Sequence, residues 1–168
     1  MLYCRLVSAC LSCLQSMFLP TLPLVTDHEE EPVVPSQCQV VFNDQAAVQH
    51  LVSLLDRDTS SPTQQIAICN ILQCCCRTTD HQNILVTAGV LSPLTTVLCS
   101  THVTSVQAAA LQCLASIVTN NVSSSTAVMS HVSSHGKSLL SLVTQFTGRE
   151  NNVDIQLAAG RVITYMYR

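Results

Sequence analysis

The sequence of 168 residues predicts an all-α fold built as an α-solenoid, and three observations support this class. A nine-residue pattern, apolar mostly at its fourth, fifth and eighth places, recurs at residues 10–18, 67–75, 110–118 and 159–167. The copies begin 57, 43 and 49 residues apart, and a period in the forties is typical of stacked helical repeats. No window shows sustained alternation of apolar and polar residues, so essentially no β-sheet is expected. Function is therefore sought on a surface and not in a pocket.

The chain is expected to open with a helix, a loop and a second helix. Residues 1–18 hold the first copy of the pattern and are predicted to be the long third helix of a preceding repeat unit. Residues 19–43 break the rhythm with four prolines around the acidic run 27–31. Prolines and like charges favour an extended chain, so a solvated loop is predicted, with an acidic docking segment as the alternative. Residues 44–58 then form a helix.

Residues 61–100 are predicted to form one complete repeat unit of three helices. Ser61 followed by Pro62 is a typical helix start, because serine caps the first turn and proline fits within it. Asp80 is expected to cap a short second helix. The Ala-Gly pair ending at Gly89 supplies a corner, since glycine adopts left-handed backbone angles without steric cost. Residues 90–99 form the last helix.

The same order of motifs continues to the end of the sequence. Residues 102–147 are predicted as another repeat, and residues 151–168 as the third helix of a further unit. The array therefore comprises about three units, and we expect it to be truncated at both ends, because finished solenoids carry polar end repeats. The shared apolar positions of the repeats predict four buried leucines: Leu94, Leu98, Leu111 and Leu114.

Composition excludes several classes of function. The chain is 48% hydrophobic and 10% charged, which suits a globular core and not a disordered chain. Lysine and arginine total 7 against 10 acidic residues, so no basic stripe for nucleic acid is expected. The apolar stretch near the N-terminus is broken by Arg5 and ended by Pro20, too short for a membrane span. It only loosely resembles a signal peptide, so cytoplasm and nucleus are expected.

The ten cysteines and six histidines form no recognisable site. Cys10 and Cys13 have the spacing of a zinc half-site, but no second pair completes it. Residues 74–76 are consecutive cysteines on a helix, where neighbours point about 100° apart and cannot converge on one ion. We therefore expect reduced thiols, no metal, no cofactor, no catalytic residue and no small-molecule substrate. A redox or metal protein that uses the cysteines is the alternative.

Residues 80–91, with the sequence DHQNILVTAGVL, resemble the armadillo-repeat consensus. The ordered series of segments at 74–85, 110–113 and 155–166 further resembles the armadillo-repeat scaffold subunits of CTLH (GID)-type ubiquitin ligases. The likeness covers about residues 4–168 and fails over residues 21–37. It implies a right-handed armadillo-type solenoid that acts as a non-catalytic scaffold in proteasome-dependent protein degradation. Its implied partners are LisH/CTLH-domain and substrate-receptor subunits in the cytoplasm and nucleus.

The resemblance also implies which positions face a partner. Importin-type members bind basic peptides with a tryptophan and asparagine ladder on their third helices, along the concave side. Here the corresponding places on the four pattern copies hold Ser12 and Ser16, Cys69 and Gln73, Gln112 and Ser116, and Arg161 and Tyr165. The importin ladder is missing, and a catenin-like adhesion adaptor, the runner-up, would need more basic residues. The candidate protein-binding residues are Gln73, Gln112, Ser116, Arg161 and Tyr165, unless they are simply solvated polar positions.

Overall fold

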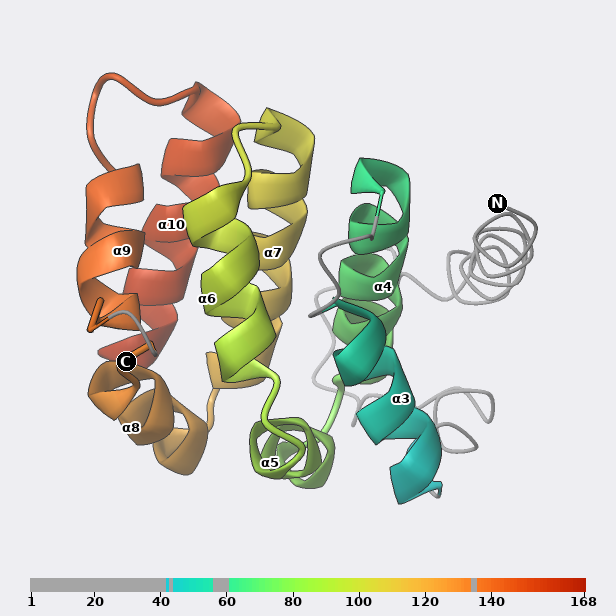
Figure 1. Cartoon of the computed structure of the whole chain (residues 1–168). Coiled ribbons are helices and arrows are strands. Elements are labelled where there is room, and N and C mark those ends of the chain that lie inside the picture. The colour runs from blue at the N-terminus through green and yellow to red at the C-terminus, as the bar shows by residue number, and fades with distance from the viewer. Residues whose placement is uncertain (1–41, 43, 56–60, 134–135) are drawn as a thin grey trace, which may run out of the picture.

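The computed structural model describes Phe42 and residues 44–55, 61–133 and 136–168 (Figure 1). The predicted helix at residues 1–18 and nearly all of the proline-rich loop lie outside these residues. The described part contains eight α-helices: α3 (Gln45–Leu55), α4 (Pro62–Cys75), α5 (Thr79–Thr87), α6 (Leu91–Ser100), α7 (Thr104–Val118), α8 (Val122–Ser130), α9 (Leu139–Phe146) and α10 (Val153–Met166). The all-α prediction is confirmed.

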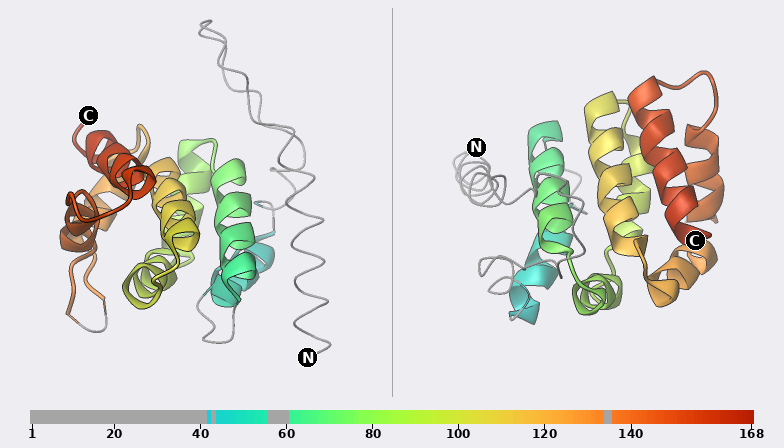
Figure 2. Two further views of the ribbon diagram at one scale, coloured as in Figure 1. Left: turned by 90° about the horizontal axis from the view of Figure 1, so that it is seen from above. Right: turned by 180° about the vertical axis from the view of Figure 1, so that it is seen from behind.

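The helices form two layers that repeat along the chain. The long helices α4, α7 and α10 lie side by side in one layer, seen from behind in Figure 2, and the contacts of α7 with α4 and with α10 are the most extensive among the described helices. The helices α3, α6 and α9 form the second layer, which faces the viewer in Figure 1. The short helices α5 and α8 lie across one end of the layers. This consecutive packing is that of an α-solenoid.

Helix α4 begins where the sequence predicts it. The Ser61 hydroxyl accepts a hydrogen bond from the Gln64 backbone N–H at 3.3 Å, and the Gln64 side chain accepts one from the Ser61 N–H at 3.1 Å. This reciprocal capping box satisfies two backbone donors that a helix start leaves without intrahelical partners. Pro62 occupies the first helical position, where its missing N–H costs nothing. The helix therefore starts at a sharply defined residue.

The predicted cap of α5 is wrong by two residues. Thr78, and not Asp80, is the N-cap, since its hydroxyl accepts a hydrogen bond from the His81 N–H at 3.3 Å. Asp80 lies in the first turn, where its carboxylate faces the positive end of the helix dipole. The predicted corner is confirmed: Gly89 has a φ of 84°. Helix α6 then starts and ends one residue later than predicted.

The core lies between the two layers and follows the shared apolar positions. The four predicted leucines are at most 2% exposed, so this prediction is confirmed. Several buried residues of the long helices α4, α7 and α10 are small: Ala67, Cys69, Ala109, Ala110, Cys113, Ala158 and Ala159. Small side chains at these places allow helix axes to approach closely with ridges packed into grooves.

The described segments also bear on the predictions that the chain has no sheet and no membrane span. In the described segments, β pairing is limited to one isolated antiparallel bridge between Val132 and Ser138, which closes the turn before α9. Within those segments, no single helix is both long and apolar enough to cross a bilayer. Helices α5 and α6 reach the required length only together, across a bend of 73°.

Gly160 in α10 offers a simple test of the helix assignment. A Cβ atom built at Gly160 meets no atom within 4 Å, apart from its own helix backbone, so alanine fits without displacement. Glycine inside a helix is less favourable than alanine because it loses more backbone entropy on folding. We expect Gly160→Ala to raise the free energy of unfolding by about 0.5–1 kcal/mol in a urea titration. A loss of stability would contradict the packing around α10.

Candidate protein-binding face

The five candidate residues lie on the layer formed by α4, α7 and α10. These helices carry the nine-residue pattern and correspond to the third helices of the armadillo resemblance, so the layer is here called the third-helix face. Gln73, Ser116 and Tyr165 occupy equivalent places on the three helices, and Gln112 and Arg161 occupy an equivalent pair one turn earlier. Residues four apart share one face of a helix. Arg161 is exposed and the other four are half-buried. The third place in the earlier row, Cys69, is fully buried, so that row is incomplete on α4.

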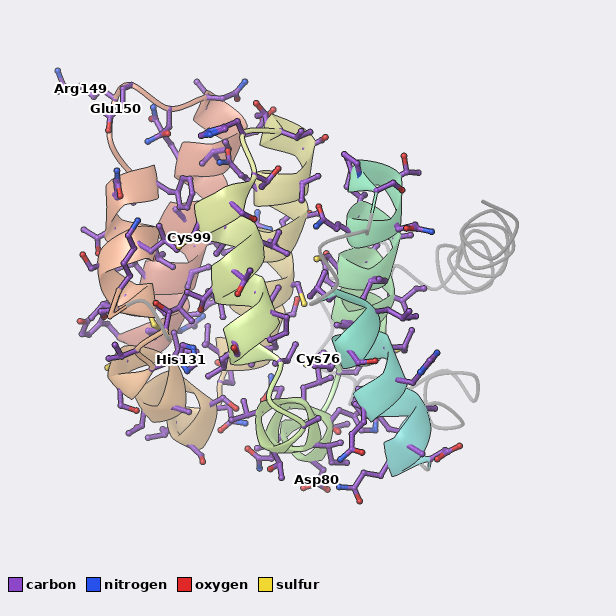
Figure 3. All side chains as sticks on the ribbon, in the orientation of Figure 1. Cys76, Asp80, Cys99, His131, Arg149 and Glu150 are labelled. Atoms are coloured by element: carbon purple, nitrogen blue, oxygen red, sulfur yellow. The ribbon has the colours of Figure 1, made fainter. Side chains whose placement is uncertain are left out.

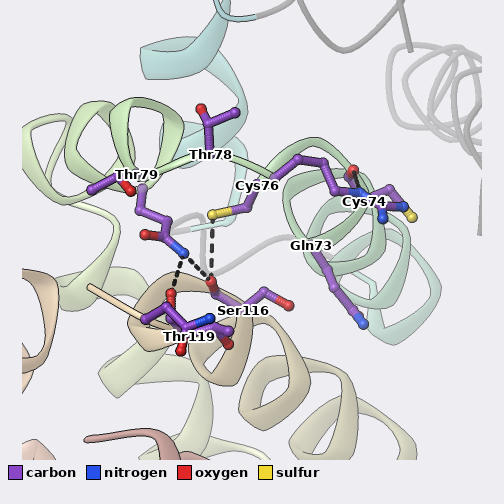
Figure 4. Close-up of a pocket in the computed structure, with 10 residues that line it drawn as sticks. Gln73, Cys74, Cys76, Thr78, Thr79, Ser116 and Thr119 are labelled. Carbon is purple, nitrogen blue, oxygen red and sulfur yellow. Dashed lines mark hydrogen bonds between the residues drawn. The ribbon is translucent and has the colours of Figure 1, made fainter. Parts of the chain in front are cut away.

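Gln73 and Ser116 meet in a groove between the C-terminal ends of α4 and α7 and the start of α5 (Figure 4). This upstream junction groove has a volume of about 560 Å³. Its walls also include Arg77, Thr119 and Asn120. Most of the lining residues have polar side chains, and the groove lies between α4 and α7 of successive repeats.

Gln82 on α5, which also lines this groove, holds α5 against the end of α7. Its side-chain Nε2 donates hydrogen bonds to the backbone oxygens of Ser116 and Thr119, both at 2.9 Å (Figure 4). Both acceptors lie at the C-terminal end of α7, where helix carbonyls lack intrahelical donors. Gln82 is only 5% exposed, and its Oε1 has no hydrogen-bond partner among the described residues.

Tyr165 lies in a second groove. This groove occupies the place in the next repeat that is equivalent to the place of the first groove. This downstream junction groove, of about 360 Å³, lies between α8 and the end of α10 and includes Asn120, Asn121 and Arg168. Asn121 caps α8 and also donates a hydrogen bond from Nδ2 to Asn83 Oδ1 at 3.0 Å, which links α8 to α5. Asn120 lines both grooves and has a φ of 54°, a left-handed conformation that asparagine tolerates better than most residues.

Gln112 and Arg161 meet in a third groove, here called the central groove, which has a volume of about 520 Å³. Helices α4, α7 and α10 all contribute to it. Asn70 lies at its α4 side, and Asp154 and Leu157 accompany Arg161 on α10. The five candidates are thus distributed over three grooves on one face and do not share a single pocket.

Sequence reasoning missed most of the residues that line these grooves, among them Asp154, Leu157, Gln82 and Asn121. Asp154 and Leu157 could have been found, because they stand 49 residues after Ser105 and Ala108 in the repeat register. Gln82 and Asn121 gave no sequence signal, since their interhelix hydrogen bonds join residues 34 to 42 positions apart.

The described cysteines, apart from exposed Cys99, are buried in the core. Burial raises the pKa of the Cys69 and Cys76 thiols to about 12, and burial with the neighbouring thiols raises that of Cys113 well above its ordinary value. Such thiols stay protonated, whereas the thiolate is the form that reacts or binds metal. Among the residues placed by the structure, no group of three histidine, cysteine or acidic side chains is arranged to hold a metal ion. Cys10 and Cys13 lie outside the described residues.

Thiol reactivity should follow this burial. With iodoacetamide at mildly alkaline pH, we expect exposed Cys99 to be alkylated in the native protein, and Cys69 and Cys113 only after unfolding. Peptide mass spectrometry reads each site. Ten thiols should react in denaturant without a reducing agent. A smaller number, or stoichiometric zinc by elemental analysis, would contradict the packing role.

The buried thiols also make stability depend on alkaline pH. An unfolded thiol loses its proton near pH 9, but folded Cys69 keeps its proton up to about pH 12. The contribution of the buried thiols is therefore complete below pH 9 and is lost as pH rises from 9 to 12.

Comparison with known proteins gives sequence and structural relatives, although no protein-family model matches the chain. The chain is 30% identical to armadillo repeat-containing protein 8 of Danio rerio over 96% of its own length and 21% of the relative's. It is 29% identical to the proteins of that name from Xenopus laevis and Mus musculus, over 98% of its length in each case. The chain thus spans about a fifth of the length of these relatives.

A solved structure supports the fold. The crystal structure of an engineered repeat protein superposes with a TM-score of 0.64 at 20% identity, covering 78% of this chain and 49% of the other. At this identity the likeness concerns the fold alone. The repeat spacing, the two layers of helices and the sequence relatives all indicate the same fold. The chain is an armadillo-type α-solenoid and, over nearly all of its length, a distant homologue of armadillo repeat-containing protein 8.

Proposed function

We propose that this chain is a non-catalytic scaffold that binds protein partners through its third-helix face, within a CTLH (GID)-type ubiquitin-ligase complex. The homology to armadillo repeat-containing protein 8 over 96% of the chain is the observation that carries the proposal. The partners proposed are LisH/CTLH-domain and substrate-receptor subunits, met in the cytoplasm and nucleus. The complex directs the substrates that its receptor recruits to proteasome-dependent degradation.

The third-helix face supports a binding role in physical terms. It presents three grooves whose linings together come from five helices, α4, α5, α7, α8 and α10, so a partner can contact successive repeats at once. Its exposed arginine and half-buried tyrosine are residue types that contribute much of the binding energy at protein interfaces. Polar side chains at half-buried places add hydrogen bonds at fixed positions. Recognition by such a face depends on its residues being held rigidly by the core.

Arg161 and Tyr165 are the first residues to test. We expect the double variant Arg161→Ala/Tyr165→Ala to bind partner subunits roughly fivefold more weakly, because truncated interface anchors typically cost about 1 kcal/mol or more. Arg161 is exposed and Tyr165 is only half-buried, so the thermal midpoint should fall by only a few degrees. Surface plasmon resonance and circular dichroism measure the two effects. Unchanged binding in a folded double variant would show that α10 is not part of the partner-binding surface.

Affinity purification of the tagged protein from its native cells tests the proposed assembly. We expect mass spectrometry to recover LisH/CTLH-domain proteins together with a RING subunit. The variant Val132→Ala, at a side chain that is 57% exposed and lines none of the three grooves, serves as the control and should recover the same set. Recovery of cadherin-linked proteins without those subunits would reject the ligase assignment and favour a catenin-like adhesion adaptor.

A further inference from the structure

The central groove has two unlike walls built from equivalent repeat positions. Helix α7 contributes Ser105, Ala108 and Gln112, and α10 contributes their equivalents 49 residues later, Asp154, Leu157 and Arg161. Two of the three α7 side chains are small, which leaves room above that helix. The three α10 side chains are longer, and they give an acid, an apolar group and a base along one stripe.

This α10 stripe is open to a ligand. Leu157 is 65% exposed, and Asp154 and Arg161 are both exposed. Neither charged group forms an ion pair with another residue in the described part of the chain. Asp154 and Arg161 are seven residues apart, so at 1.5 Å per residue they are separated by about 10.5 Å along one face. The groove therefore carries a negative end and a positive end about two helical turns apart.

We infer that the central groove binds a single helix of a partner protein, oriented along α10 and carrying opposite charges seven residues apart. This inference rests on the proposed binding role and specifies the partner's chemistry. The partner's basic side chain lies against Asp154, an apolar side chain packs on Leu157, and an acidic side chain lies against Arg161. The partner helix matches the spacing of the stripe because it has the same rise per residue.

The physical character of the groove favours a helix over an extended segment. A helix satisfies its own backbone hydrogen bonds, whereas an extended chain must find partners for its free N–H and C=O groups. The walls of the groove are helices whose own backbones are already paired, and only Asn70 and Gln112 contribute side-chain amides. The small side chains of Ser105 and Ala108 allow a third helix to approach closely.

Stapled helical peptides of about four turns test this inference with the full chain. Each carries leucines at i+3 and i+4, and charges at i and i+7 that are Lys/Glu, Lys/Lys or Glu/Glu. By fluorescence anisotropy, the native chain should bind the mixed peptide roughly threefold to fivefold more tightly than either like-charged peptide. Asp154→Lys should shift the preference to the Glu/Glu peptide, and Arg161→Glu to the Lys/Lys peptide. These preferences hold for either direction of the bound helix.

Two matched variants make the same charge changes outside the groove. Asp80→Lys changes another acid in the first turn of a helix, and Arg149→Glu changes an arginine in the connection before α10; Figure 3 shows them at opposite ends of the molecule. Both should keep the native preference, and circular dichroism should show all four variants folded. An unchanged preference in Asp154→Lys and Arg161→Glu would overturn the inference. Equal binding of an unstapled, proline-containing mixed peptide would show an extended ligand and also overturn it.

The peptide-binding experiment can fail while the proposed function stands, and the reverse is also possible. If the tagged chain recovers ligase subunits while the peptides show no charge preference, the assembly stands and the groove assignment fails. If the peptides rank as expected but no ligase subunit is recovered, the groove assignment stands and the ligase proposal fails.

Discussion

Leu111→Ala should lower the free energy of unfolding by about 2–5 kcal/mol, the usual range for emptying a buried leucine site. Leu111 is 0% exposed and lies at the middle of α7, which contacts α4, α5, α6, α8 and α10. Because helices pack around it on several sides, the surroundings cannot collapse easily into the space that the side chain leaves. Urea titration followed by circular dichroism measures the change.

The matched control for Leu111→Ala is Val122→Ala, which also truncates an aliphatic side chain. Val122 is 83% exposed at the start of α8, so its loss should change stability by no more than about 0.5 kcal/mol. A change below that value for Leu111 as well would mean that the assigned face of α7 is not buried.

Gln82→Ala should cost about 2 kcal/mol, because it removes both hydrogen bonds from α5 to the end of α7 and leaves a space in a buried site. The same urea titration measures the loss. The bonds join α5 to the end of α7, so the variant should weaken the packing of α5 against α7. Hydrogen exchange at α5 should increase accordingly.

Gln82→Met separates the hydrogen bonds from the space they occupy. Methionine has a similar length but no donor, and it also removes the unpartnered Oε1. We expect a loss of about 1 kcal/mol, intermediate between the native chain and Gln82→Ala. If Gln82→Met is as stable as the native chain, the two hydrogen bonds do not stabilise the packing of α5 against α7.

Much of the fold could be predicted because local and tertiary signals agree. The Ser-Pro start of α4, the glycine corner before α6 and the four buried leucines follow from residues within one or two turns of each other. The cap of α5 was missed because Thr78 and Asp80 are both good capping residues, and only the backbone geometry selects between them. Asp80 lies in the first turn of α5, where its negative charge interacts favourably with the helix dipole.

The candidate face was less predictable than the helices. Repeat register places Gln112 with Arg161 and Gln73 with Ser116, as the central and upstream junction grooves show. Register alone does not reveal that Cys69 is fully buried while Gln112 is half-buried and Arg161 is exposed. That difference depends on how closely neighbouring helices approach, which is a tertiary property. The role of these residues in binding stays a prediction.

Site-specific photo-crosslinking tests the central claim, that the third-helix face contacts protein partners, most directly. A benzophenone amino acid placed at Gln112 of the tagged full-length protein lies in the central groove, whereas one at Thr96 lies on an exposed place of α6 in the other layer. After irradiation in native cells, Gln112 should give covalent adducts with LisH/CTLH-domain or substrate-receptor subunits, and Thr96 should give few. Adducts of those subunits from Thr96 and none from Gln112 would contradict the account.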